Sequence, residues 1–406
     1  MLTRVVTTAG RAAGGPAAVL ALLGVLASGC TAAAPQLATA RPGPGCSART
    51  AQGRVLAGAR PVPATVPGSP TAAISTPDGR WVFASLSAGH AGQIAVMTAR
   101  DGVPRLVRDV PLPPSLAGGF GMALTHDGWW LVVAGYAATA VLSVAALESG
   151  RGDPVRGVLA GAGAGAFEVA VSGDDRYLFV SDETSGGLSV FDLAVALRER
   201  FDARGVDAGI VPLAAGAVGV ALSPGGSTVY VTTFGRYGPH GQLWLIAAAR
   251  AARGAGRRAV LAHVPAGCQP VRVAVSPDGR TAWVTALQSN ALLAFSTAAI
   301  RRNPRHAVRA VVRVGSEPVG LALADDGRIA LVADSNRGLV AGTGGAAPQS
   351  VSVIGTAAAL AGRPALLGRV PAGLFPRDVS YDPATGQVLL ANFSSGTIEE
   401  FPAPRG

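Results

Sequence analysis

Residues Val271 to Leu287, VRVAVSPDGRTAWVTAL, decide the fold of this 406-residue chain. Two short apolar runs flank the turn Ser276-Pro-Asp-Gly279. Pro presets the first turn residue, Asp bonds its own backbone, and Gly accepts a positive φ. The stretch therefore predicts a tight β-hairpin built from small apolar residues.

The same hairpin pattern recurs seven times along the chain. Successive turn positions are 47 to 59 residues apart and fall at Gly79, Gly128, Asp175, Gly226, Gly279, Gly327 and Gly386. Asp tolerates positive φ better than most residues, so Asp175 suits the one copy that lacks Gly. Each copy continues into a third strand, as in residues 187–193, and a fourth, as in residues 309–315. Four strands in about 50 residues are typical of a propeller blade, which predicts an all-β, seven-bladed propeller of four-stranded antiparallel blades.

The two ends of the repeat region complement each other. The seventh copy runs out after its third strand, near residues 397–402, and a spare strand, residues 60–66, precedes the first copy. We expect this N-terminal strand to complete the last blade, because closure leaves no open sheet edge. The predicted propeller spans residues 60–402.

The amino terminus has the pattern of an export signal. Arg4 and Arg11 precede an apolar stretch from Ala17 to Leu26, which is shorter than the roughly 20 residues of a membrane span. Cys30 follows Leu-Ala-Ser-Gly, which resembles a bacterial lipobox. We therefore expect a signal peptide at residues 1–29, a lipid on Cys30, and a tether at residues 30–59. The alternative is ordinary secretion with cleavage beyond Cys30.

No second apolar span follows, so we expect a protein held in the bacterial cell envelope by its lipid, on the extracytoplasmic side of the membrane. All 34 basic residues are Arg, which excludes chemistry that needs a lysine. The formal charge of +10 is spread along the chain, and the two dense Arg runs lack interleaved aromatics. We expect no nucleic-acid partner, and a monomer.

Two cysteines remain after Cys30. An exported protein with two further thiols, Cys46 and Cys268, invites a disulfide. Their places in the repeat do not ensure that they meet, and the sequence slightly favours two separate thiols. On the sequence alone, both alternatives stay open.

Strand ends in the repeats carry a family resemblance. The segments VSDE from Val180, VTTF from Val231 and VADS from Val332 follow turns of the S-P-D-G type. They resemble the YVTN-type repeats of surface-layer proteins, YncE-like secreted proteins and lactonase-like propellers, over about residues 60–402. The resemblance implies the propeller fold. Lactonase-like relatives use His, Glu and Arg at the channel mouth, but no His of this chain matches that pattern, so no catalytic role is carried over.

Propellers bind at the mouth of their central channel, where the loops into each first strand meet the loops between second and third strands. Polar and charged side chains at these positions are the candidate binding residues. They are Glu168, Arg272, Glu317, Arg377, Asp378, Asp182, Arg236, Tyr237, His240, Asp334, Arg337 and Asn392. Haem, zinc and EF-hand motifs are absent, so we expect no cofactor and no metal.

The sequence favours a non-catalytic binding platform for a small ligand, a glycan or an envelope protein. A lactonase-like hydrolase is the alternative, with Glu168 as base and Arg272 and Arg377 as clamps for a small anionic substrate. A purely structural surface protein is the third hypothesis.

Overall fold

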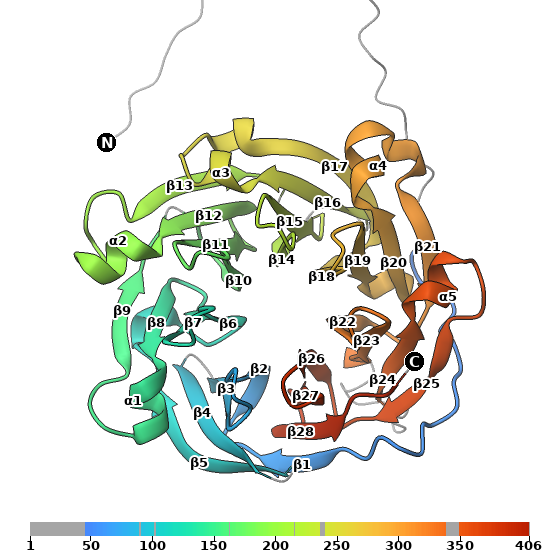
Figure 1. Cartoon of the computed structure of the whole chain (residues 1–406), viewed down its shortest axis with the longest axis horizontal. Helices are drawn as coiled ribbons and strands as arrows, with labels where there is room; N and C mark the ends of the chain where they lie inside the picture. Colours follow the sequence, from blue (N-terminus) through green and yellow to red (C-terminus); the bar gives the residue numbers. More distant parts are fainter. Residues whose placement is uncertain are drawn as a thin grey trace, which may run out of the picture. The chain divides into compact units, whose positions relative to one another are not determined.

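The computed structural model describes residues 45–88, 91–100, 103–161, 163–214, 216–235, 240–337 and 349–405. These residues form seven four-stranded antiparallel sheets, set as blades around a central axis (Figure 1). The predicted fold is confirmed.

Within each blade the strands follow one another from the channel outward. Blade 1 has β2 (Ser69–Ser75), β3 (Trp81–Ala88), β4 (Ala91–Arg100) and β5 (Val103–Pro111). Blade 2 has β6 (Met122–Leu124), β7 (Trp130–Ala134), β8 (Thr139–Ser143) and β9 (Val155–Leu159). Blade 3 has β10 (Ala166–Val171), β11 (Tyr177–Asp182), β12 (Gly187–Asp192) and β13 (Asp207–Pro212). Blade 4 has β14 (Ala217–Leu222), β15 (Thr228–Thr233), β16 (His240–Ala247) and β17 (Val260–Cys268).

The remaining blades have the same arrangement. Blade 5 has β18 (Pro270–Val275), β19 (Thr281–Ala286), β20 (Ala291–Ser296) and β21 (Val308–Arg313). Blade 6 has β22 (Pro318–Ala324), β23 (Ile329–Asp334), β24 (Ser350–Gly355) and β25 (Leu366–Pro371). Blade 7 has β26 (Pro376–Asp382), β27 (Gln387–Asn392), β28 (Thr397–Pro402) and, outermost, β1 (Val62–Thr65).

In the part of the chain that the structure describes, five short α-helices connect third strands to fourth strands at the periphery of blades 2 to 6 (Figure 1). They are α1 (Val144–Ser149), α2 (Leu193–Arg198), α3 (Ala248–Ala251), α4 (Thr297–Arg302) and α5 (Thr356–Leu360). Short 3-10 turns lie at Pro114–Leu116, Gly256–Ala259, Leu287–Ser289 and Pro304–His306.

The ring closes as expected. Strand β1 pairs antiparallel with β28, with Val62 opposite Glu400 and Thr65 opposite Thr397. The first strand of the described residues thereby joins the last blade, which leaves that blade without an open outer edge.

The repeated turns have the predicted backbone. All seven turn positions take a positive φ, including Asp175 at 56° beside Gly279 at 69°. Asp175 also accepts hydrogen bonds from the amides of His126 and Asp127 in the neighbouring blade. The one non-Gly turn residue therefore links two blades as well as turning the chain.

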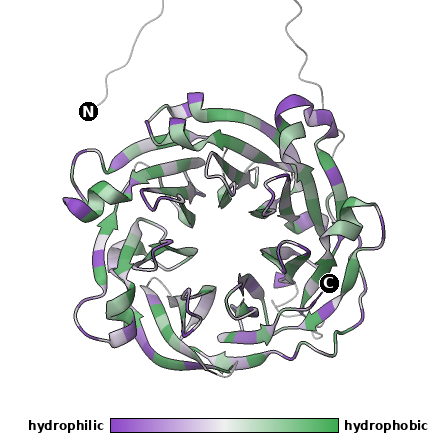
Figure 2. Ribbon diagram, viewed as in Figure 1, coloured by the Kyte–Doolittle hydropathy of each residue, from purple (hydrophilic) through white to green (hydrophobic). Residues whose placement is uncertain are grey.

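Apolar side chains pack between neighbouring blades. Leu243 and Leu245 of blade 4 belong to one buried cluster with Val284, Leu293 and Phe295 of blade 5. Hydrophobic residues run along the strands and over much of the short helices, and hydrophilic residues lie mainly on the turns (Figure 2). Burial between blades, repeated around the ring, is the main stabilising term.

Hydroxyl groups near the ends of second strands also join blades. Thr232 accepts from the amide of Gly219 at 3.0 Å and donates to the carbonyl of Val271 in the next blade at 2.6 Å. Ser181 and Thr285 make the same paired contacts in their blades. These hydroxyls fix the backbone at the mouth end of the inner strands.

Residues 46–59 form an ordered segment, which we call the strap, lying against the propeller. Its start meets blades 4 and 5, since Cys46 is bonded to Cys268, and Asn290 Nδ2 donates to the Ala48 carbonyl at 2.7 Å. Further on, Val55 pairs in parallel with Arg369 on the outer strand of blade 6. Part of the segment that we expected to be a tether is therefore docked. Within the described residues, no helix has the length and apolar character of a membrane span.

Candidate functional site

Three inner strands place a charged residue at one register position facing the channel. The backbone amide of Glu168 in β10 donates to Ser181 Oγ, and that of Arg272 in β18 donates to Thr285 Oγ1. Asp378 in β26 lies at the corresponding shift in strand register of blade 7. Gly219 and Gly320 occupy this register in two other blades. A Cβ on Gly219 would lie 2.2 Å from the Val271 carbonyl, so these inner strands are too close for a side chain there. The charged residues therefore stand among very small neighbours.

The side chains meet across the channel. Arg272 Nη2 lies 2.9 Å from Glu168 Oε2 and its Nε lies 3.8 Å from Asp378 Oδ1. Arg272 is only 7% exposed, so this ion group is largely withdrawn from water. Sequence reasoning placed all three residues at the mouth, and the structure brings them together.

The ion group is incompletely hydrogen-bonded. Among the described residues, Arg272 Nη1 and Glu168 Oε2 have no hydrogen-bond partner. The short distance to Glu168 Oε2 is thus a charge contact without hydrogen-bond alignment. A buried polar atom without a hydrogen-bond partner lowers the stability of the fold by about 1–3 kcal/mol, unless a water molecule or a ligand provides the missing hydrogen bond.

Arg377, next to Asp378, faces aromatic rings. Its guanidinium carbon lies 5.6 Å from the ring centre of Phe120, 5.4 Å from that of Phe167 and 5.5 Å from that of Phe393. Within the described residues it makes no ion pair, unlike Arg272. Cation–π contacts support the charge without neutralising it.

Electrostatics follow from burial. Loss of hydration raises the pKa of Glu168 to about 7, against the opposing effect of Arg272. Burial likewise raises the pKa of Asp378, and burial together with Arg272 lowers the pKa of Arg377 to about 10. Neutral pH therefore lies close to the pKa of Glu168, whereas it lies well below the pKa of Arg377.

The phenylalanines around Arg377 were missed by sequence reasoning. Phe120 and Phe167 stack with ring centres 5.6 Å apart. Each immediately precedes the residue at the charged register, as Arg377 precedes Asp378. Aligning the strand entries one residue earlier would have found them.

Other candidate residues have different surroundings. Asp182 accepts from Ser189 Oγ at 2.8 Å, and burial raises its pKa to about 7. Asn392 is buried and donates to Thr397 Oγ1. The amide of Glu317, at the entry to β22, donates to Asn290 Oδ1 at 2.9 Å. Arg337 is exposed and close enough to Arg377 to contribute to lowering its pKa.

Asp334 points to the outer strands of blade 6, away from the channel group. It accepts from the Gly315 amide, from Ser350 and Ser352, and from Arg369 Nη1 at 3.3 Å. A cavity of about 420 Å³ lies beside it, under the strap. Arg369 also donates to the Ala51 carbonyl at 2.6 Å, so this residue pair holds the strap in place.

His240 and the two cysteines form a separate group. Cys46 and Cys268 are joined by a disulfide with Cα atoms 5.5 Å apart, which decides between the two alternatives left open by the sequence. His240 Nδ1 lies 3.7 Å from Cys268 Sγ. Cys30, Arg236 and Tyr237 lie outside the described residues.

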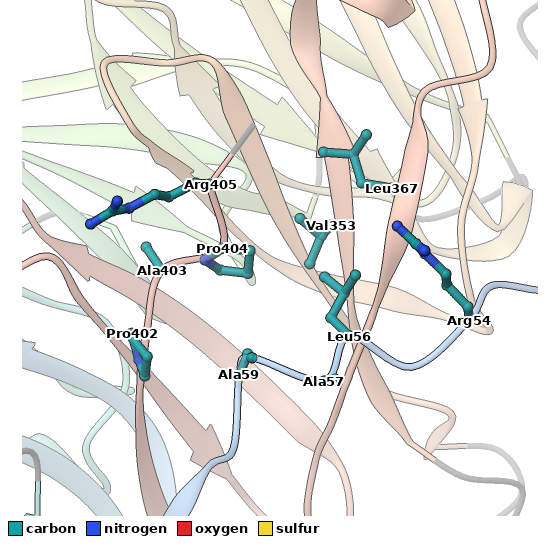
Figure 3. Close-up of a pocket in the computed structure, with 11 residues that line it drawn as sticks. Arg54, Leu56, Ala57, Ala59, Val353, Leu367, Pro402, Ala403, Pro404 and Arg405 are labelled. Atoms are coloured by element: carbon teal, nitrogen blue, oxygen red, sulfur yellow. The ribbon is translucent and has the colours of Figure 1, made fainter.

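A larger cavity, of about 530 Å³, lies between the strap and blades 6 and 7. Figure 3 shows Arg54 and Arg405 on its two sides, with Leu56, Val353 and Leu367 between them. Its lining has no carboxylate, hydroxyl, thiol or imidazole side chain. Acid–base or nucleophilic chemistry therefore has no donor there.

Comparisons with known proteins support the fold. Hydrazine synthase of Kuenenia stuttgartiensis is similar with a TM-score of 0.64 and 15% identity, over 84% of this chain and 97% of that chain. The Cps50 (Swd1) β-propeller domain of Myceliophteria thermophila is similar with a TM-score of 0.61 and 10% identity, over 84% of this chain and 98% of that chain. No protein-family model and no curated protein matches the chain. At such identities the likeness concerns the fold alone.

Proposed function

We propose that this protein is an envelope-anchored binding propeller whose channel mouth holds a small carboxylate ligand. The observation that carries the proposal is the guanidinium of Arg377, which lies among three phenylalanine rings and makes no ion pair with the described residues. Beside it, Nη1 of Arg272 has no hydrogen-bond partner among the same residues. A carboxylate accepts paired hydrogen bonds from guanidinium groups, and an apolar ligand body packs on aromatic rings.

Arg377→Gln tests the binding role. Removing the guanidinium should weaken capture of small carboxylates about tenfold or more, because charge-assisted hydrogen bonds contribute roughly 1.5–3 kcal/mol. A panel of small carboxylates with apolar bodies would be titrated by calorimetry at pH 6. Arg405→Gln, an exposed arginine at the other cavity, is the matched control and should bind as the parent does. Equal affinities in the two variants would refute the proposal.

A hydrolase is the second candidate function. One observation favours it: burial brings the pKa of Glu168 to about 7, in the range that suits a general base. Its buried Oε2, however, lies against Arg272, and no histidine contact with this group is present among the described residues. Turnover of a lactone and ester panel that disappears in Glu168→Gln would establish catalysis and replace the binding-only proposal.

We also propose the lipid anchor on Cys30 and membership of the YVTN/YncE-like propellers. The anchor is supported by the lipobox, and membership by the seven turns and strand ends. Cys46 lies at the mouth-end rim, because Cys268 ends a fourth strand directly before an inner strand begins. Fifteen residues lie between Cys30 and Cys46, which gives a reach of at most about 55 Å. An anchored protein would thus keep its channel mouth close to the membrane surface.

The anchor has a direct test. Cys30→Ser should move the protein from the membrane fraction to the soluble fraction of bacterial cells expressing the full chain. Cys46→Ser is the matched cysteine control and should leave the protein in the membrane fraction. Unchanged membrane retention of Cys30→Ser would exclude the lipid on this residue.

A further inference from the structure

A compact group of three potential metal ligands lies at the mouth-end rim, apart from the channel. The ligand atoms of Cys46, His240 and Cys268 all lie within 4.8 Å of one another. In the structure the two sulfurs are bonded to each other, and a disulfide does not ligate as thiolates do. We propose that reduction of this disulfide creates a binding site for one thiophilic d¹⁰ cation, Cu⁺ or Zn²⁺, with a Cys₂His ligand set.

The distances already suit such a cation. Metal–sulfur bonds of about 2.3 Å and metal–nitrogen bonds of about 2.0 Å place sulfur and nitrogen ligands roughly 3.5–4 Å apart. His240 Nδ1 lies 3.7 Å from Cys268 Sγ, within that interval. The two bonded sulfurs must separate, which requires a side-chain rotation, and the Cys46 sulfur lies within 4.8 Å of the His240 ligand atom. Two thiolates and one imidazole are a donor set that these soft cations prefer.

The strap should keep Cys46 in place when the disulfide opens. The amide of Ser47 donates to the Gln288 carbonyl at 2.6 Å, and the amide of Ala51 donates to the Val314 carbonyl at 2.8 Å. On the other side, the amide of Cys268 donates to Ser289 Oγ at 3.0 Å. The backbone at both cysteines is therefore held by hydrogen bonds that do not depend on the disulfide, so the two cysteines stay near each other.

The group is also accessible. Cys268 is buried, Cys46 is half-buried, and His240 is exposed. A cation and a reductant can thus approach from the solvent side. A Zn²⁺ ion would take water as its fourth ligand there, whereas Cu⁺ is satisfied by three ligands.

The chemistry balances with a dithiol as the reductant. Two electrons and two protons pass from the dithiol to the Cys46–Cys268 disulfide, and the dithiol becomes a disulfide. The cation then displaces the two thiol protons and bonds to both sulfurs and to His240. The covalent link between the strap and blade 4 is thereby replaced by a metal-mediated link between the same two cysteines.

Titration of the full chain carrying Cys30→Ser tests the proposal, because Cys46 and Cys268 are then its only cysteines. Oxidised and reduced samples would be titrated anaerobically with Cu⁺ and, separately, with Zn²⁺ against a chromogenic chelator. The reduced protein should bind one equivalent of at least one cation, and the oxidised protein none. Binding of Cu⁺ alone, or of Zn²⁺ alone, identifies the cation. Failure of the reduced protein to bind either would overturn the proposal.

Variants separate this site from adventitious binding. His240→Ala should weaken metal binding by the reduced protein at least tenfold. His126→Ala, an exposed histidine that contacts Asp175 instead, is the matched control and should bind normally. Equal affinity in both variants would exclude His240 as a ligand and overturn the Cys₂His assignment.

Limited proteolysis gives a second measurement that does not need a substitution of Cys46 or Cys268. Cleavage within residues 45–59 should be slow in the oxidised protein, faster after reduction, and slow again when the cation is added to the reduced protein. His240→Ala should lose the protection by metal while keeping the protection by the disulfide. Metal that leaves cleavage of the reduced parent unchanged would show that Cys46 is not a ligand.

Discussion

Two buried arginine–carboxylate groups in this propeller differ in how completely they are hydrogen-bonded. In blade 6, Asp334 accepts from one amide, two hydroxyls and Arg369. In the channel, Arg272 lies between Glu168 and Asp378, and two polar atoms of the group lack a hydrogen-bond partner among the described residues. The carboxylate of the blade 6 group is fully hydrogen-bonded within the fold. The channel group leaves Arg272 Nη1 and Glu168 Oε2 without a hydrogen-bond partner among the described residues. Charge and burial alone would not have separated them.

The largest loss of stability is expected at the fully hydrogen-bonded Asp334–Arg369 group of blade 6. Asp334→Ala should lower the free energy of unfolding by about 3–5 kcal/mol, because it leaves the largely buried guanidinium of Arg369, 15% exposed, without its carboxylate. Chemical denaturation would measure the loss. Arg328→Ala, which breaks an exposed ion pair with Asp325, is the control and should cost less than about 1 kcal/mol. Similar losses in the two variants would remove the structural role assigned to Asp334.

The channel group should show itself in the pH dependence of stability. The pKa of Glu168 is raised by burial to about 7 in the folded protein, so the folded state holds this proton more tightly than the unfolded chain does. Its contribution to stability is present at low pH and is lost as the pH rises toward about 7.

Glu168→Gln should therefore flatten the decline in unfolding free energy between about pH 4.5 and 7, by up to about 1.4 kcal/mol per pH unit. Urea unfolding at four pH values would measure the slope. The exposed Glu199→Gln should leave that slope unchanged. A Glu168→Gln slope equal to that of the parent would show that Glu168 titrates normally.

A smaller loss of stability is expected for the Thr232 hydroxyl, which is uncharged and both accepts and donates a hydrogen bond. Thr232→Val removes the hydroxyl that joins Gly219 of its own blade to Val271 of the next. The free energy of unfolding should fall by about 1–2 kcal/mol, with no change in carboxylate binding. Thr50→Val, on the exposed part of the strap, should stay within about 0.5 kcal/mol of the parent. A loss of binding in Thr232→Val would instead tie the hydroxyl to the site.

The fold could be predicted because it depends on local patterns that repeat. Asp175 and Gly279 both take positive φ, as their turn chemistry required. The strand at residues 60–66 was expected to close the ring, and β1 pairs with β28. Each blade contains the same hairpin pattern, so the seven copies independently supported the prediction of a propeller.

The candidate site was predictable only in part. The sequence located Glu168, Arg272 and Asp378 at strand entries, since blade geometry brings all entries to one face. It grouped Asp334 with them, although that side chain turns to the outer strands. Which way a strand-end carboxylate points depends on neighbours such as Ser352, which lie in another strand.

The sequence by itself determined the blade number, the turn conformations and the closing strand, because these follow from short-range pattern and from the need to pair sheet edges. Only the tertiary structure decided that Arg377 meets three phenylalanines, that Arg272 reaches two carboxylates, and that Cys46 meets Cys268. The contacts of Arg377 with Phe120 and Phe167 and of Arg272 with both carboxylates join different blades, and the disulfide joins the strap to blade 4 across 222 positions. Such pairings depend on how the ring packs, which no local pattern contains.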